Sequence, residues 1–297
     1  MYAFLSRITS LAVLILFLAT QSFAVTILRD PDMERGLREL AKPILAAAGL
    51  SGNIKILVVD NPALNAFVID NKTIFVHSGL ILKLSSAEQL QAVLAHEAAH
   101  IANGHISRRI TNIQSAQRTA LYGVLLAVAV AAAGENKAAA GVASGIAGSA
   151  RGVFFGHTRA EESSADQSAI RYLNRSKIPL TGMRDVFEIF RGQEVLKLSR
   201  QDPWARTHPL SRDRVRATQA AMASARATKS DPNYTYWFER VQGKLSAFKR
   251  APSWTLRRAK GTSDIDLMRK AIAHHRNAQS QTAQNAIAHL GQRRPTH

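Results

Sequence analysis

Cysteine is absent from the 297-residue chain. This absence excludes disulfides, thiolate metal ligands, a cysteine nucleophile and a lipoprotein anchor. Long apolar runs are missing too. Residues 11–20 and each half of residues 119–150 fall short of the roughly 20 residues that a helix needs to span a bilayer. Acidic residues are scarce, with 21 Asp and Glu against 39 Lys and Arg, so the formal net charge is +18. A metal site in this chain would have to be built from histidine and carboxylate side chains.

The first 24 residues have the pattern of a secretory signal peptide. Arg7 precedes the apolar stretch Leu11–Thr20, and Ser22-Phe23-Ala24 forms a small-x-small cleavage signal before Val25. An uncleaved membrane anchor is the alternative interpretation. Export of a chain without cysteine suits a bacterial periplasm, where an unpaired thiol is liable to oxidation. We therefore expect a periplasmic protein that has no nucleic acid as a partner.

The segment His96-Glu97-Ala98-Ala99-His100 has the spacing of half a catalytic zinc site. On a helix, residues four apart lie one above the other, so two imidazoles can bind one metal ion. A tetrahedral zinc ion then has room for a third protein ligand and a water molecule. Glu97 would lie beside that water, where a carboxylate can act as a general base. A capping box that begins at Ser85 or Ser86 supports the helix.

A third metal ligand must come from elsewhere in the chain. The metzincin pattern requires glycine at position 103 and histidine at position 106, but this chain has Gly104 and His105, each displaced by one residue. A better candidate is Glu162, which shares a helix face with Asp166 four residues later. Asp166 can accept a hydrogen bond from the far nitrogen of a ligand histidine and fix its tautomer. The weaker alternatives are Glu161 and His157.

Four segments together resemble the HtpX-like and CAAX-prenyl-endopeptidase group of zinc metallopeptidases, most of all its periplasmic BepA-like branch. The resemblance covers roughly residues 30 to 225, and the combination is specific although no single segment is. The segments are Asn65–Leu80, His96–His100, Thr158–Asp166, and Thr207–Pro209 with Arg214. One departure is Ala99, which stands where the group usually has glycine. Alanine favours a helix more than glycine does, so the helix should tolerate it.

The resemblance implies a role for each matching residue of the metal site. His96, His100 and Glu162 would bind one zinc ion (Zn2+) per chain. Glu97 would be the catalytic base, taking a proton from the attacking water and passing it to the leaving amine. No other cofactor is implied.

Three further residues gain supporting roles from the resemblance. His208, which by itself would be an ordinary surface histidine before a proline, would approach the metal. There it would act in catalysis by stabilising the oxyanion, or it would cap the zinc in a resting form. Asp166 would support a ligand histidine from behind, and Arg159 would anchor the helix of the third ligand electrostatically.

The expected fold class is α+β. It consists of a mainly helical, gluzincin-like zincin domain with a small β-sheet, plus a short C-terminal helical hairpin. Asp30 and Pro31 predict the start of a helix, and Ile54–Val59 predicts a strand. Asn65–Leu80 predicts a hairpin with its turn at Asp70-Asn71. An edge strand of this hairpin can pair with an extended peptide substrate through main-chain hydrogen bonds. The alternative is a strand that pairs only within the domain.

Three parts of the chain are expected: a signal peptide (1–24), a zinc metallopeptidase domain (25–225) and a basic helical tail (226–297). Within the second, residues 119–150 form an apolar helical insertion that packs on the domain, dips into a membrane surface or spans the membrane. From Lys197 onward, 20 Lys or Arg stand against 6 Asp or Glu. The basic surface that these residues form would bind anionic lipid or would simply be solvated. Residues 263–290 resemble the start of a tetratricopeptide array, which normally needs stacked neighbours.

The expected function is that of a zinc-dependent metalloendopeptidase. Its substrates would be unfolded or misassembled envelope proteins, and the outer-membrane assembly machinery is a candidate partner. Peripheral contact with the membrane through residues 119–150 is the alternative to their packing on the domain. The main alternative is a non-proteolytic periplasmic chaperone or assembly factor that retains its zinc site. A cationic envelope-binding protein with a vestigial site is a weaker one, because ligands, base and supporting residues are all present.

Overall fold

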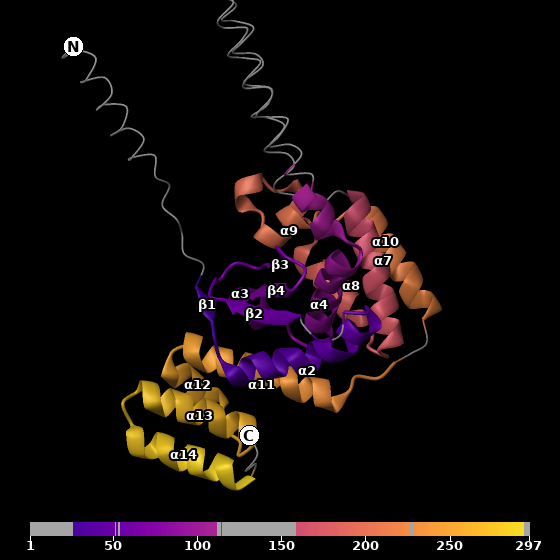
Figure 1. Cartoon of the computed structure of the whole chain (residues 1–297). Helices are drawn as coiled ribbons and strands as arrows, with labels where there is room; N and C mark the ends of the chain where they lie inside the picture. Colours follow the sequence, from indigo (N-terminus) through magenta and orange to yellow (C-terminus); the bar gives the residue numbers. More distant parts are fainter. Residues whose placement is uncertain are drawn as a thin grey trace, which may run out of the picture.

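The computed structural model describes residues 26–50, 52, 54–111, 114, 159–225 and 228–293. The expected signal peptide and the apolar stretch 119–150 lie outside the described residues. Figure 1 shows a small sheet surrounded by helices, with a further layer of helices toward the C-terminus. The strands are β1 (Ile27–Leu28), β2 (Lys55–Val59), β3 (Ala66–Val68) and β4 (Thr73–His77). The helices are α2 (Pro31–Ala47), α3 (Ser78–Lys83), α4 (Ala87–Ala102), α7 (Arg159–Arg175), α8 (Thr181–Phe190), η1 (Gln193–Val195), η2 (Leu198–Arg200), α9 (Pro203–Thr207), α10 (Arg212–Ser224), α11 (Pro232–Lys249), α12 (Pro252–Arg258), α13 (Asp264–Arg276) and α14 (Ser280–Arg293).

This small mixed sheet has the strand order β1-β2-β4-β3. Strands β2 and β4 run parallel, with Leu57 opposite Phe75, whereas β1 and β3 are antiparallel to their neighbours. β3 and β4 form the predicted hairpin, and Asp70 Oδ1 in its turn accepts a hydrogen bond from the Lys72 backbone N–H at 2.8 Å. β3 therefore lies at one edge of the sheet, next to α4. The fold is α+β and mainly helical, as the sequence predicts.

Helix α4 carries the two-histidine motif through the core of the molecule. Ser86 Oγ accepts a hydrogen bond from the Gln89 backbone N–H at 3.3 Å, and Gln89 Oε1 accepts one from the Ser85 backbone N–H at 2.7 Å. This arrangement is a close variant of the predicted capping box. Every residue from Ala87 to Ile101 is buried, because α2, α7, α8 and α11 all pack against this helix. The motif therefore lies within the core of the molecule.

Helix α8 begins so close to α4 that only glycine fits at its second residue. A Cβ on Gly182 would lie 2.2 Å from the Glu88 carbonyl oxygen and 2.8 Å from the Gln89 backbone nitrogen. Both are backbone atoms and cannot swing aside. We expect Gly182→Ala to lower the free energy of unfolding by about 1–3 kcal/mol in urea denaturation of the zinc-free protein. Gly291→Ala on α14, where a Cβ meets open space, is the control. Equal urea midpoints for the two variants would contradict the prediction.

Helix α11 is part of the same core, although it follows residue 225. Trp237, Phe238, Val241 and Leu245 are buried in one apolar cluster with residues of α2 and α4. Gly36 permits the close approach of α2, because a Cβ there would lie 2.5 Å from Val241 Cγ2. Figure 1 shows α2 and α11 side by side beneath the sheet. The core that holds α4 is therefore completed by a helix from the C-terminal part of the chain.

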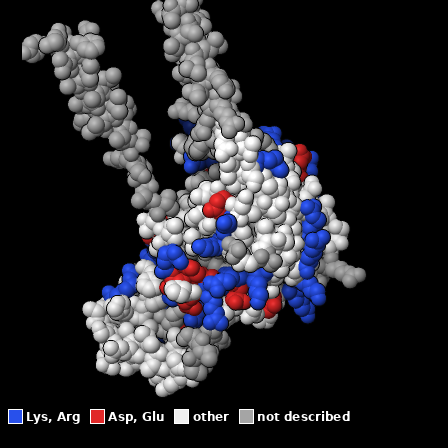
Figure 2. All heavy atoms as spheres, in the orientation of Figure 1, with Lys and Arg blue, Asp and Glu red and all other residues white. Residues whose placement is uncertain are grey.

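Helices α12, α13 and α14 form a layer beyond α11, and α13 with α14 makes the expected helical hairpin. Residues 277–292 contain no Lys, Arg, Asp or Glu. Figure 2 shows this end of the molecule largely without charged side chains on the visible face. The basic surplus of the C-terminal part is therefore not spread over all of its helices. Among the residues described, no helix is both long and apolar enough to cross a bilayer.

Candidate metal centre

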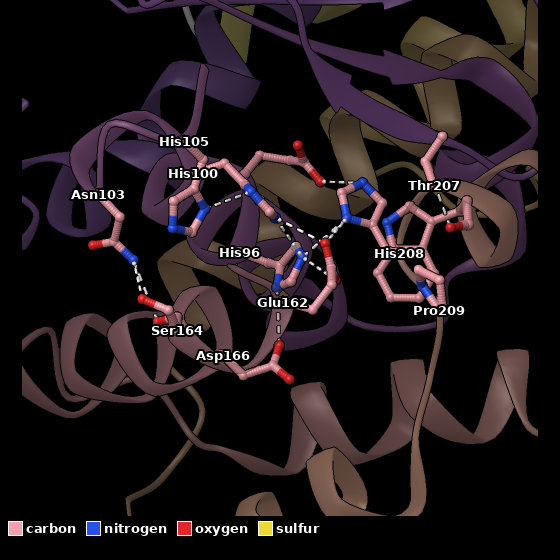
Figure 3. A network of polar contacts seen from close by, with 12 residues as sticks. His96, His100, Asn103, His105, Glu162, Ser164, Asp166, Thr207, His208 and Pro209 are labelled. Atoms are coloured by element: carbon pink, nitrogen blue, oxygen red, sulfur yellow. Dashed lines mark hydrogen bonds and ion pairs between the residues drawn. The ribbon is translucent and has the colours of Figure 1, made fainter. Parts of the chain in front are cut away.

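Helix α4 presents His96 and His100 on one face, one turn apart. Their Nε2 atoms are 3.0 Å from each other, and both side chains are buried. Figure 3 shows the two rings pointing toward a common centre that Glu162 and His208 also face. Two ring nitrogens this close in a buried site need a proton or a metal ion between them, because neutral imidazole nitrogens without a proton are both acceptors.

Helix α7 supplies the acidic pair that was predicted from its spacing. Glu162 Oε2 lies 3.3 Å from His96 Nε2, and Glu162 Oε1 lies 3.4 Å from His100 Nε2. One turn later, Asp166 Oδ1 accepts a hydrogen bond from His96 Nδ1 at 3.0 Å. A carboxylate can only accept here, so His96 holds its Nδ1 proton toward Asp166 and turns Nε2 toward the centre. The structure thus places Glu162 among the converging donors and Asp166 behind one of them.

The residue after α9 brings His208 to the same point. Its backbone N–H donates to the Trp204 carbonyl at 2.8 Å, and the Trp204 ring centroid lies 5.2 Å from that of the imidazole. His208 Nδ1 is 3.2 Å from His96 Nε2 and 3.0 Å from Glu162 Oε1. The side chain is buried, which sets it apart from an ordinary surface histidine. Three distant segments of the chain therefore meet at one centre.

Glu97 is fully buried beside this centre. Its Oε1 lies 3.5 Å from His208 Nε2, yet neither of its carboxylate oxygens accepts a hydrogen bond from a described residue. Burial raises the pKa of Glu97, although the charges of His208 and His96 oppose the shift. A raised pKa brings the carboxylate closer to the range in which it can accept and return a proton near neutral pH.

The charges of the centre favour opposite protonation states at neighbouring groups. Burial disfavours the charged form of His96, but the charges of Glu162 and Asp166 raise its pKa to about 10. Burial lowers the pKa of His100 well below its usual range. Burial also works against ionised Glu162, yet the charges of His208 and His96 hold its pKa well below the usual range. The metal-free centre therefore keeps a proton on His96 at neutral pH, and a metal ion bound there must displace it.

Arg214 of α10 holds the far side of the acidic pair. Its Nη2 donates to Asp166 Oδ1 at 2.9 Å, its Nε donates to Asp166 Oδ2, and its Nη1 lies 2.9 Å from Glu162 Oε2. The same Nη1 donates to the Pro209 carbonyl at 2.8 Å. The buried guanidinium thus joins α7 to the loop that carries His208. The family resemblance includes Arg214 together with the segment Thr207–Pro209. Its contact with Glu162 and Asp166, however, depends on tertiary packing, which the sequence spacing does not reveal.

Arg159 makes no anchoring contact with the acidic pair among the described residues. It is the first residue of α7 and is exposed. Within the part of the chain that the structure describes, no ion pair joins it to Glu162 or Asp166. A cation at a helix N-terminus also opposes the helix dipole. The cation that contacts the acidic pair is Arg214.

The remaining candidates from the sequence do not join the four donors. His105 lies behind His100, and the Nδ1 atoms of the two rings are 2.9 Å apart. Glu161 is adjacent to the third-ligand candidate but is not one of the converging residues. His157 lies outside the described residues.

The donor set fits a zinc ion. His96, His100, Glu162 and His208 each offer one ligand atom, and these atoms all lie within 4.8 Å of one another. Zinc binds imidazole nitrogen and carboxylate oxygen at about 2.0–2.2 Å, so two of its ligands are at most about 4.4 Å apart. The separations given above between donor atoms run from 3.0 to 3.4 Å. The oxygens of Glu97 beside this set accept no hydrogen bond from a described residue, which is consistent with a ligand that completes the centre.

Comparison with known proteins agrees with this geometry. The model of Peptidase family M48 matches residues 28–222. The beta-barrel assembly-enhancing protease of Yersinia pestis is 25% identical over 221 residues, which cover 73% of this chain and 45% of that protein. The protein of the same name from Escherichia coli is 25% identical over 190 residues, covering 64% and 39%. Protease HtpX of Xanthomonas oryzae pv. oryzae is 34% identical over 94 residues, covering 30% and 32%.

The chain spans less than half the length of these relatives. The family match nevertheless covers more than half of the chain and includes all four converging residues together with Glu97. Histidine and glutamate donors buried in one centre are what a zinc-dependent peptidase requires. The chain therefore belongs to Peptidase family M48, a family of zinc metallopeptidases.

Proposed function

We propose that this protein is a zinc-dependent metalloendopeptidase that hydrolyses peptide bonds of unfolded or misassembled envelope proteins. One observation carries the proposal. The four donors His96, His100, Glu162 and His208 converge in the core, directly beside a buried carboxylate whose oxygens have no hydrogen-bond partner among the described residues. A purely structural zinc site needs no such carboxylate, whereas hydrolysis needs a base.

Each residue of the centre has a distinct task in this mechanism. Zinc, held by His96, His100 and Glu162, would supply a Lewis acid that polarises the scissile carbonyl and acidifies water. Glu97 takes the proton of the attacking water and returns it to the leaving amine. Asp166 accepts the hydrogen bond from His96 Nδ1 and so leaves the lone pair of His96 Nε2 free to bind a metal ion. His208 Nε2, near Glu97 Oε1, is placed to donate to the carbonyl oxygen as charge develops there.

Strand β3 is the proposed docking edge for substrate. It is the last strand of the sheet on the side of α4, so its outer backbone groups are not paired within the sheet. An extended chain can add to such an edge through main-chain hydrogen bonds, which depend little on side chains. This mode suits substrates that share an unfolded backbone and no common sequence.

The proposed location and partners are supported by the relatives and by the N-terminal segment. Two relatives are named for enhancing beta-barrel assembly. Together with the predicted signal peptide (1–24), this supports a periplasmic enzyme that works near the outer-membrane assembly machinery. We further propose that residues 25–225 form the metallopeptidase domain, whose core α11 completes, with contact to the membrane through residues 119–150. Residues 226–297 would be a basic tail with an incomplete tetratricopeptide-like repeat.

A second candidate function rests on His208. Its Nδ1 lies within 3.2 Å of both His96 Nε2 and Glu162 Oε1, so it supplies a fourth donor to the same centre. Zinc with four protein ligands has no open position, which is the arrangement of structural sites. This geometry favours either a resting enzyme or a zinc-holding assembly factor that binds unfolded chains without cutting them.

Removal and return of zinc separates these functions. We expect the mature protein (residue 25 onward) to cleave casein when loaded with zinc, to lose this activity after chelation, and to regain it when stoichiometric zinc is added. Cleavage is measured by the release of acid-soluble peptides, and metal content is measured on the same samples. A zinc-loaded protein that binds casein but releases no peptide would contradict the peptidase and support the assembly factor.

A further inference from the structure

We infer that His105 is a positioning residue, which holds the metal-binding ring of His100 through a hydrogen bond to its far nitrogen. The inference rests on the proposed function, because it concerns the same zinc centre. The rings of His96 and His100 are both buried, and each must be held with its Nε2 toward the metal. Asp166 does this for His96. For His100 the atom in the equivalent place belongs to His105.

The backbone at the end of α4 is shaped to bring His105 to this place. The Asn103 backbone N–H donates to Ala99 O at 2.9 Å, and the Gly104 backbone N–H donates to Ile101 O at 3.0 Å. Gly104 adopts a φ of +70°, a left-handed conformation that glycine reaches without strain. The chain turns there, and residues 105–111 start a new helical segment. The turn directs the first side chain of that segment back toward the helix it has just left.

The contact that results is buried and well formed. His105 is 1% exposed, and its Nδ1 lies 2.9 Å from His100 Nδ1. The two ring centroids are 4.9 Å apart and the rings are inclined at 70°, so they meet edge to face instead of stacking. Figure 3 shows His105 on the side of His100 opposite to Glu162 and His208. His105 is therefore excluded from the donor set but touches one of its members directly.

The chemistry of the pair fixes the tautomer of both rings. A His100 ring that presents Nε2 to a metal ion carries its proton on Nδ1. His105 Nδ1 must then be the acceptor, so His105 carries its proton on Nε2. A side chain that only fills space would not require this arrangement. The centre thus has two unlike supports, a carboxylate behind His96 and a neutral imidazole behind His100.

Two substitutions at one position test this role. Leucine removes the acceptor, whereas asparagine keeps an acceptor oxygen close to the former position of Nδ1. We expect His105→Leu to weaken zinc binding roughly 10–100-fold, as is typical when the partner of a ligand histidine is removed. His105→Asn should recover most of that loss. Zinc affinity is measured by competition with a chromophoric chelator, and the d–d absorption of the cobalt-substituted protein reports ligand geometry. His289→Leu on exposed α14 is the matched control.

The wild-type protein provides a measurement that does not depend on a variant's folding. In nitrogen-15 correlation spectra of the zinc-loaded protein, His105 should show a proton on Nε2 and His100 a proton on Nδ1. The inference is overturned if the tautomers are reversed, if His105→Leu binds zinc as tightly as the wild type, or if His105→Asn binds as weakly as the leucine variant. None of these readouts involves cleavage. A zinc-binding wild type that cuts nothing would contradict the proposed function alone.

Discussion

Replacing Glu97 by glutamine will lower the rate of cleavage by orders of magnitude and leave zinc in place. The substitution removes the charge that accepts a proton from water and changes the side-chain volume very little. General-base catalysis contributes roughly 10²–10⁴-fold to a rate, and the peptidase activity should fall by that factor. Zinc should stay because Glu97 is not one of the four converging donors. The variant should also be no less stable, because glutamine ends the burial of a charge that lacks hydrogen-bond partners among the described residues.

The measurement compares initial rates of casein cleavage and zinc content for matched variants. Glu88→Gln is the control, because Glu88 lies on the same helix and undergoes the same chemical change away from the donors. It should keep the activity of the wild type. If Glu97→Gln cleaved casein at the wild-type rate, the base would have to be another group. If both variants and the wild type held zinc without cleaving, the assembly-factor alternative would gain support.

Replacing Arg214 by methionine will lower the free energy of unfolding of the metal-free protein far more than a substitution of an exposed arginine does. Burial works against the charged guanidinium, but hydrogen bonds and the charge of Asp166 raise the pKa of Arg214 above its usual value. Arg214→Met would leave Asp166 without its main cationic partner and Glu162 without one of its neighbours. Breaking a buried ion pair by removing one partner typically costs about 3–5 kcal/mol. We expect a loss of this size in the free energy of unfolding.

The matched control for Arg214 lies two residues further along α10. The side chain of Arg216 is 75% exposed and makes only a loose ion pair, at 3.8 Å, with Asp213. Arg216→Met should therefore change stability by no more than about 0.5 kcal/mol. Urea denaturation after exhaustive chelation gives both values. Similar midpoints for the two variants would show that the buried contact contributes little. Arg214→Met should also bind zinc more weakly, because Asp166 then lacks its hold on the ring of His96.

Those parts of the site that depend on local spacing were predictable from the sequence. His96, Glu97 and His100 share one helix, and Glu162 and Asp166 share another, so a period of 3.6 residues places each set on one face. The capping residues around Ser86 and the turn at Asp70 are local signals of the same kind. Tertiary packing then brings the two faces together. That meeting could be expected from the family resemblance, not from spacing.

Other parts depend on contacts between distant segments and were not predictable in this way. Arg159 lies three positions before Glu162 in the sequence, but the guanidinium in contact with the acidic pair comes from Arg214, 52 positions after Glu162. His105 differs from a metzincin ligand by one residue, and a turn at Gly104 converts that difference into a position behind His100. The boundary predicted at residue 225 follows the extent of the family resemblance, yet Trp237 and Val241, which lie beyond it, are buried in the same core.

The place of α11 in the core has a consequence for how the enzyme is made. Gln242 Nε2 donates to the carbonyls of Ile81 and Leu84, at 2.9 and 2.7 Å, just before α4 begins. The chain that precedes the metal helix therefore finds these partners only after residue 242 has been synthesised. Until then the apolar face of α2 that receives Val241 has no cover. A peptidase assembled in this order cannot complete the core around its metal helix before α11 has been synthesised, so we expect the nascent chain to be inactive until then.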